Sequence, residues 1–297
     1  MTAMAAEQKR LEIKGMWLGL GGVAIFSLTL PFTRLAVAEL NPIFVAMGRA
    51  VLAAVLAGLL MWSQKARLPQ RSELKALLIT ACGVVLGFPL LSTLAMQYVA
   101  AAHGAIVLGI LPLATALFAA LRFHERPSAG FWLMAALGSG LVFAFAMMQG
   151  AGSLKWADFA LFGAVILAAM GYAEGGRLAQ SMGGLQVIAW ALILILPVTL
   201  SLSLWAWWQF GLHASGAAWG GFAYVSVFSM FIGFLFWYKG LATGGIARVG
   251  QVQLLQPFLS LLGASLIVGE SLTMMNVGFA VAVIVTVSVG RQMKIHR

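Results

Sequence analysis

The chain has 297 residues, of which 62% are hydrophobic and only 9% are charged. Soluble proteins carry roughly 45–50% apolar and about 25% charged residues, so this chain has too little polar surface to coat a water-soluble globule. Its 18 Lys and Arg outnumber 8 Asp and Glu, but basic clusters beside apolar segments usually orient a membrane protein rather than bind nucleic acid. We predict a polytopic protein surrounded by lipid, with no nucleic-acid partner. The single cysteine, Cys82, excludes an internal disulfide and a thiolate metal site.

Ten apolar segments follow one another, each near the ~20 residues that cross a hydrocarbon layer of ~30 Å. The first follows a short stretch of mixed charge without a small-residue cleavage site, which predicts an uncleaved helix rather than a signal peptide. All connections are short and leave no room for a soluble domain between the helices. The expected spans are 15 to 37, 42 to 62, 74 to 97, 103 to 121, 129 to 148, 157 to 176, 185 to 205, 217 to 238, 247 to 268 and 273 to 291.

An even number of spans places both termini on one side of the membrane, and Lys and Arg accumulate on the cytoplasmic side. With cytoplasmic termini, only Arg34, Arg49 and Lys155 of the 18 basic residues lie elsewhere. We therefore predict a multi-pass protein of the cell (inner) membrane with both ends in the cytoplasm. The basic residues on that side are Lys9, Arg10, Lys14, Lys65, Arg67, Arg71, Lys75, Arg122, Arg126, Arg177, Lys239, Arg248, Arg291, Lys294 and Arg297.

Two spans, the fourth and the ninth, each carry a proline followed 13 residues later by a glutamate. The segments 112–125 and 257–270 superimpose at a shift of 145 without a gap. This predicts two halves of five spans each, 1–150 and 151–297. Because five is odd, the second half enters the membrane inverted. Inverted repeats are the usual architecture of secondary transporters, with a midplane site between the halves.

These helix ends also carry a resemblance to a known family. The relevant sequences are Leu111-Pro112 through His124-Glu125-Arg126, Gln256-Pro257 through Gly269-Glu270-Ser271, and the second-span pattern Phe44-Val45-Ala46-Met47-Gly48-Arg49. These motifs resemble those of the drug/metabolite transporter superfamily, specifically its EamA-type ten-helix exporters. The resemblance covers essentially the whole chain. The family's usual Gly-Glu-Arg turn is His-Glu-Arg in the first half and Gly-Glu-Ser in the second. The resemblance implies no ATP hydrolysis and no cofactor, and it extends to bacterial exporters of amino acids, including aromatic ones.

The ninth span carries the best candidates for substrate binding. Gln253, Gln256 and Ser260 fall with Val249 in one arc of ~60° at about 100° per residue, and both glutamines lie near the middle of the membrane. Their amides would donate hydrogen bonds to, and accept them from, a polar or zwitterionic solute. The alternative is hydrogen bonding between helices.

Further binding candidates lie on the first, third and eighth spans. Ser27 belongs to an interrupted first span, and Phe88 and Ser92 lie mid to late in the third. Trp237 and Tyr238 end an aromatic stripe on the eighth span. Packing, lipid contact or an interfacial aromatic belt is the commoner role of such a stripe.

Prolines lie inside several spans. A proline inside a span frees a backbone carbonyl and kinks the helix, so Pro31, Pro89, Pro112 and Pro257 predict an all-α basket around a central cavity. Because Pro112 and Pro257 occupy equivalent places in the two halves, we predict that they are paired hinges for alternating access. Simple curvature for packing is the alternative for any one proline.

Charged residues inside the spans are few. Arg49 lies about a third of the way into the second span and needs a partner. A substrate carboxylate is one answer, and snorkelling, Glu39 or backbone carbonyls are others. Glu174 is the only acid well inside a span, and Arg177 one turn later is a simple ion-pair partner. We therefore expect Glu174 not to couple protons.

The histidines and Asp158 bear on the enzyme alternatives. His103 is expected at the outer mouth with Tyr98, more as an interface anchor than as a gate, and the four histidines lack metal-ligand spacing. Asp158, the only aspartate, lies near a loop, whereas aspartyl proteolysis needs two acids at depth. A serine protease would need a base at depth, and no phosphate-binding loop is present. A membrane enzyme is therefore disfavoured, and a scaffold subunit would leave the repeat unexplained.

A secondary exporter or facilitator of small organic solutes, working by alternating access, remains the favoured class. Amide and aromatic groups with a sparsely acidic interior favour amino acids, including aromatic ones, as the solutes. A multidrug or other metabolite exporter of the same fold is the second choice. We expect a monomer or a weak homodimer.

Overall fold

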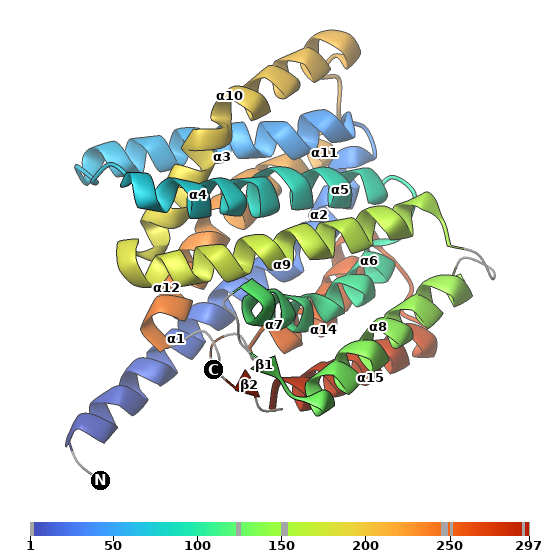
Figure 1. The fold of residues 1–297 in the computed structure, drawn as a ribbon. Helices are drawn as coiled ribbons and strands as arrows, with labels where there is room; N and C mark the ends of the chain where they lie inside the picture. The colour runs from blue at the N-terminus through green and yellow to red at the C-terminus, as the bar shows by residue number, and fades with distance from the viewer. Residues whose placement is uncertain are drawn as a thin grey trace.

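The computed structural model describes residues 3–122, 126–149, 154–244, 249, 252–292 and 295–296. Its helices run back and forth across one bundle, with α3 beside α10, α5 and α7 beside α9, and α8 beside α15 (Figure 1). The helices of the first part are α1 (Ala3–Ser27), α2 (Thr29–Val37), α3 (Pro42–Ser63), α4 (Arg71–Thr80), π-helical η1 (Ala81–Gly87), α5 (Phe88–Ala95), α6 (Ala101–Val107), 3-10 η2 (Leu108–Ile110), α7 (Leu111–Arg122) and α8 (Ala129–Gln149). Those of the second are α9 (Trp156–Met182), α10 (Gly184–Phe210), α11 (Gly216–Ala223), π-helical η3 (Tyr224–Ile232), α12 (Gly233–Gly244), 3-10 η4 (Gln253–Leu255), α14 (Gln256–Gly263), π-helical η5 (Ala264–Val268) and α15 (Met274–Gln292).

Within the described residues, eight helical segments are long and apolar enough to cross a membrane. Two shorter apolar helices, Gln253–Val268 and Met274–Gly290, occupy the places expected for the ninth and tenth spans. The protein is thus a multi-pass membrane protein. The eight segments are Arg10–Val37, Pro42–Ser63, Arg71–Ala95, Ala101–Arg122, Ala129–Met148, Trp156–Met182, Gly184–Phe210 and Gly216–Gly244.

One small feature departs from an all-helical fold. The two-residue strand β1 (Arg126–Pro127) pairs antiparallel with β2 (Ile295–His296), so that Arg126 lies opposite His296. This pairing holds the end of the chain beside the connection between α7 and α8.

Regular helix is interrupted at matching places in the two proline-bearing spans. The 3-10 turn η2 precedes α7, whose second residue is Pro112, and η4 precedes α14, whose second residue is Pro257. The turns start at residues 108 and 253, which differ by 145. Proline suits the first turn of a new helix because a backbone N–H at that position would have no acceptor within the helix. A short 3-10 stretch inside a helix often marks a hinge, so each proline stands where its span changes geometry.

Glycines let α1 and α12 approach one another at backbone distance. Gly15 and Gly19 in α1, and Gly240 and Gly244 in α12, each follow the four-residue spacing typical of close helix pairs in membranes. A Cβ atom added at Gly240 would lie 2.8 Å from the Gly19 nitrogen and 3.0 Å from the Gly15 carbonyl oxygen. This glycine contact joins the first helix of the chain to a helix of the second half.

Candidate functional site

A cavity lies inside the bundle, with walls from both halves of the chain. Its lining residues come from α1, α2, α3, η1, α5, α6, η2, α7, α9, η3, α12, η4 and α14. It leaves about 30 Å³ for the centres of water-sized molecules, which is room for about two waters. The side chains therefore leave much less free space in this conformation than an amino acid fills. A solute the size of an amino acid requires them to move apart.

Five of the nine predicted binding residues line this cavity, and both predicted hinge prolines do as well. The glutamines face it from η4 and α14, as the helical period of the ninth span predicts. The lining residues among the predictions are Gln253, Gln256, Ser260, Phe88, Arg49, Pro112 and Pro257.

Two of the three predicted serines, Ser27 and Ser92, do not line the cavity. The Ser27 hydroxyl donates to the Val23 carbonyl at 2.7 Å, and the Ser92 hydroxyl donates to the Phe88 carbonyl at 2.6 Å. Hydroxyls inside helices commonly satisfy themselves in this way. Their polarity is therefore used within their own helices.

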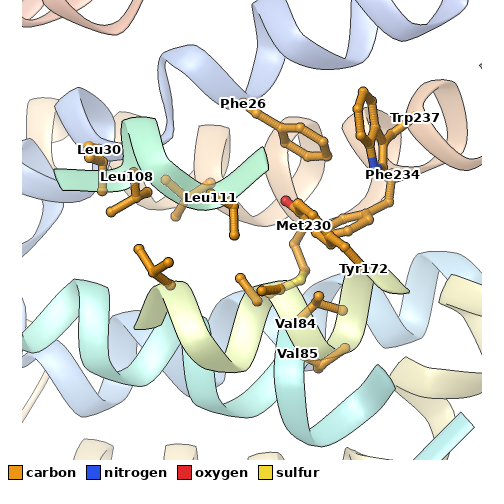
Figure 2. Packing of buried hydrophobic residues seen from close by; sticks show 14 of the residues in the cluster. Phe26, Leu30, Val84, Val85, Leu108, Leu111, Tyr172, Met230, Phe234 and Trp237 are labelled. Carbon is orange, nitrogen blue, oxygen red and sulfur yellow. The ribbon is translucent and has the colours of Figure 1, made fainter. Parts of the chain in front are cut away.

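Trp237 and Tyr238 are also absent from the cavity lining. They belong instead to a buried aromatic cluster, in which Trp237 lies near Phe26, Tyr172 and Phe234 (Figure 2) and Tyr238 contacts Phe234. The ring centroids of Phe26 and Phe234 are 4.9 Å apart, and those of Tyr172 and Trp237 are 6.2 Å apart. Three of these rings, Phe26, Tyr172 and Phe234, do line the cavity. The cluster thus supplies the cavity with an aromatic wall.

Arg49 is buried in the cavity wall, with 1% of its surface exposed. Its Nη2 donates to the Ser229 Oγ at 3.0 Å, and that hydroxyl lies 2.8 Å from the Thr29 Oγ1. The Nε and Nη1 atoms have no hydrogen-bond partner among the described residues. The arginine therefore does not snorkel to the membrane surface.

Glu39 is not the partner of Arg49. It accepts hydrogen bonds from the Ser215 hydroxyl at 2.6 Å and from the Ser215 backbone N–H at 2.7 Å, next to the start of α11. These bonds lower the pKa of Glu39 from its usual value. The carboxylate is thus committed to a contact between α2 and α11.

The two cavity glutamines present unused polar atoms. Nε2 of Gln253, a donor, and Oε1 of Gln256, an acceptor, are both buried without a hydrogen-bond partner in the described structure. Buried polar atoms are nearly always paired in native proteins. Together with Arg49, these atoms give the cavity several polar groups that the protein itself leaves unsatisfied.

At the end of the bundle where α6 begins, Glu270 joins the two halves of the chain. Its carboxylate accepts from the backbone N–H groups of Ala101 at 2.7 Å and Ala102 at 2.9 Å, the first residues of α6. Arg34 Nε lies 3.9 Å from the same carboxylate, and Arg34 Nη1 donates to the carbonyls of Met96 and Val99. We call the set Arg34, Glu270, Ala101 and Ala102 the Glu270 latch. Gly269, with a φ of +72°, makes the turn that presents Glu270.

A second contact between the halves lies beside the latch. The His103 Nε2 is 2.6 Å from Asp158 Oδ1, and Asp158 also accepts from the Lys155 backbone N–H at 2.8 Å. The prediction that His103 anchors the chain at the membrane interface is wrong, because only 6% of its surface is exposed. Tyr98, which is 66% exposed, remains free to act as such an anchor.

At the opposite end of the bundle, where α7 and α9 end, Glu174 joins the halves through Arg122. The Arg122 Nε donates to Glu174 Oε1 at 2.5 Å. This partner lies in the other half of the chain, whereas the sequence pointed to Arg177 on the same helix. The carboxylate is thus engaged in a structural ion pair.

We expect Glu174→Gln to leave transport largely intact, because the carboxylate is engaged with Arg122 and glutamine keeps an oxygen acceptor for that arginine. The initial rate of solute flux in reconstituted vesicles, at equal amounts of folded protein, measures this. Complete loss of flux in a normally folded variant would contradict it.

A bundle of membrane-spanning helices around a buried, partly polar cavity defines a membrane transport protein. The chain belongs to the EamA-like transporter family, whose model matches it twice, over residues 13–147 and 155–289. It is 48% identical over 278 residues to a Bacillus subtilis (strain 168) protein described as the uncharacterized transporter YdeK, which covers 92% of this chain and 96% of that protein. A solved crystal structure with 17% identity matches 93% of this chain and 95% of its own with a TM-score of 0.64, so it shares the fold.

Sequence reasoning missed several lining residues. Tyr172, Phe26 and Phe234 come from three different helices, and no pattern within one helix singles them out. Thr29 and Ser229 were visible as polar residues inside spans, which is a signal for a cavity-facing position. Their hydrogen bond across 200 positions of the chain was not visible.

Proposed function

We propose that the protein is a secondary exporter of small organic solutes and that these solutes are amino acids, including aromatic ones. The observation that carries this proposal is the set of unpaired polar atoms on Arg49, Gln253 and Gln256 in a cavity with an aromatic wall. An amino acid brings a carboxylate, an ammonium group and a side chain, and the cavity offers donors, acceptors and rings for these three parts.

We further propose ten spans in two inverted halves, 1–150 and 151–297, with both termini in the cytoplasm of the cell (inner) membrane. The matching 3-10 turns before Pro112 and Pro257 support this arrangement. The π-helical segments η1 and η3 support it as well, because they begin at residues 81 and 224 of the third and eighth spans. The paired prolines then serve as hinges for alternating access.

Polar contacts between the halves lie at both ends of the cavity in this conformation. The Glu270 latch and the pair of His103 with Asp158 lie at one end, and the pair of Arg122 with Glu174 lies at the other. Alternating access requires one end to open while the other stays shut. In the proposed orientation, export breaks the Glu270 latch on the outer side.

The double change of Gln253→Ala and Gln256→Ala tests the role of the cavity. Loss of two hydrogen bonds of about 0.5–1.5 kcal/mol each is expected to raise the solute concentration at half-maximal flux by about 5- to 150-fold. The measurement is concentration-dependent flux of labelled amino acid in vesicles. Gln97→Ala with Gln180→Ala is the matched control, because both of these glutamines are exposed. Unchanged affinity and rate in the cavity variant would contradict the proposal.

Export of cationic drugs is a weaker proposal for this site. Of the described residues that line the cavity, none is acidic. A cationic drug would therefore meet a positive arginine without a compensating carboxylate.

A further inference from the structure

Arg49 bears on which amino-acid-like solutes the cavity takes. Its guanidinium is charged at all physiological pH values, and it is buried within the bundle rather than at the membrane surface. Among the described lining residues it alone carries a formal charge. A buried cation without a counter-ion is unfavourable, so the cavity as built lacks one negative charge.

The protein's own contacts with Arg49 leave most of the guanidinium unused. Of its five N–H donors, the structure assigns one nitrogen, Nη2, to Ser229, and leaves Nε and Nη1 without partners among the described residues. A carboxylate is acceptor-only and planar, and it matches a guanidinium better than any neutral group does.

We propose that Arg49 is the carboxylate anchor of the cavity and that the transported solutes are therefore carboxylates, whether zwitterions or monoanions. This inference rests on the proposed function and names the chemical group that it recognises. The solute supplies the negative charge that the cavity lacks. A solute of the same shape without a carboxylate leaves Arg49 unpaired and is rejected.

Ser229 is the positioning residue for this anchor. Its hydroxyl accepts a hydrogen bond from Arg49 and makes a second hydrogen bond with Thr29. In this way η3 of the second half and α2 of the first half hold the guanidinium in the cavity wall. For a zwitterion, the unpaired Oε1 of Gln256 is an acceptor suited to the ammonium group. The rings of Tyr172 and its neighbours then suit an apolar side chain.

Competition in proteoliposomes tests the anchor. Counterflow of labelled phenylalanine is measured with unlabelled phenylalanine, 3-phenylpropionate, phenylalaninamide and 2-phenylethylamine as competitors, which share the ring but differ in the carboxylate. In the wild type we expect the two carboxylates to compete and the amide and the amine to be weaker by about 10- to 100-fold. In Arg49→Gln the preference for carboxylates is expected to disappear.

Ser229→Ala and Arg49→Lys keep the test decisive if Arg49→Gln does not fold. Ser229→Ala retains the charge but loosens its position, so the preference for phenylalanine over its amide is expected to shrink by about 3- to 10-fold, while the competition by 2-phenylethylamine stays weak. Arg49→Lys is expected to retain part of the preference for carboxylates. If Arg49 has a purely structural role, its substitution would lower the flux of labelled phenylalanine without changing the relative potency of the four competitors.

The outcomes separate the two proposals. Counterflow of phenylalanine with equal competition by the acid and the amide would overturn the carboxylate anchor and leave the proposed function standing. An unchanged carboxylate preference in Arg49→Gln, or in Ser229→Ala with Arg49→Lys, would also overturn the anchor. Absence of counterflow for every amino acid in vesicles that hold folded protein would overturn both.

Discussion

Glu270→Ala is expected to open the end of the bundle that we place on the outer side. The change leaves the N–H groups of Ala101 and Ala102 without their carboxylate and Arg34 without its counter-ion in the closed state. Unmade bonds of this kind cost about 1–3 kcal/mol, which shifts the balance of closed and open forms by about 5- to 150-fold. The cavity becomes more accessible from outside by that factor.

The opening is measured with a cysteine in the cavity. In a Cys82→Ser background, Ala105→Cys places a thiol at a buried lining position of α6, and its reaction with a membrane-impermeant maleimide is followed in intact cells. The matched control is Glu73→Ala, because Glu73 also pairs with an arginine, Arg67, and accepts from a backbone N–H, but within the first half. Equal labelling rates in the Glu270 and Glu73 variants would show that the latch does not hold this end shut.

Gly240→Leu is expected to break the contact between α1 and α12. Even a Cβ atom at this position meets backbone atoms of Gly19 and Gly15 at 2.8 and 3.0 Å, and backbone cannot yield as a flexible side chain does. Overpacking costs about 1–3 kcal/mol or more, and at about 2–4 °C per kcal/mol the Tm of the purified protein should fall by roughly 2–12 °C.

Gly58→Leu is the control for this substitution. No atom lies within 4 Å of a Cβ built at Gly58 on α3, so the same increase in volume should leave the Tm nearly unchanged. If the two leucine variants melt at the same temperature, the glycine contact does not stabilise the bundle.

Hydrophobic length and helical period predicted much of the architecture. The spans lie where apolar runs lie, and Gln253, Gln256 and Ser260 share a face that lines the cavity. The repeated segments that begin at Pro112 and Pro257 are each preceded by an equivalent 3-10 turn. These features are local, so a single segment of sequence carries them.

Three of the four predicted binding residues that do not reach the cavity lie in helices that follow a π-helical segment, although Phe88, directly after η1, does line it. Ser92 lies after the π-helical segment η1, and Trp237 and Tyr238 lie after η3. A π turn adds a residue and rotates the later part of the helix by about 100° relative to a regular helix. A helix face predicted with the regular period of about 3.6 residues is therefore displaced for the residues that follow the π turn. Ser27 lies at the break between α1 and α2.

Sequence patterns also did not predict the contacts between segments that are far apart in the chain. Glu270 was visible as the end of a repeated segment, but its bonds to α6 join residues 169 and 168 positions apart. In the second half the turn reads Gly269-Glu270-Ser271 in place of the family's usual Gly-Glu-Arg. The structure gives its glutamate a capping role, which chain pattern alone does not reveal.

The most direct test of transport through this cavity is counterflow in liposomes. Purified protein is reconstituted, and exchange of labelled phenylalanine, tryptophan, threonine and methionine is compared with that of protein-free vesicles. We predict saturable exchange that is strongest for the aromatic amino acids. Vesicles shown to hold folded protein but lacking exchange of any amino acid would contradict the assignment and direct the search to other metabolites and drugs.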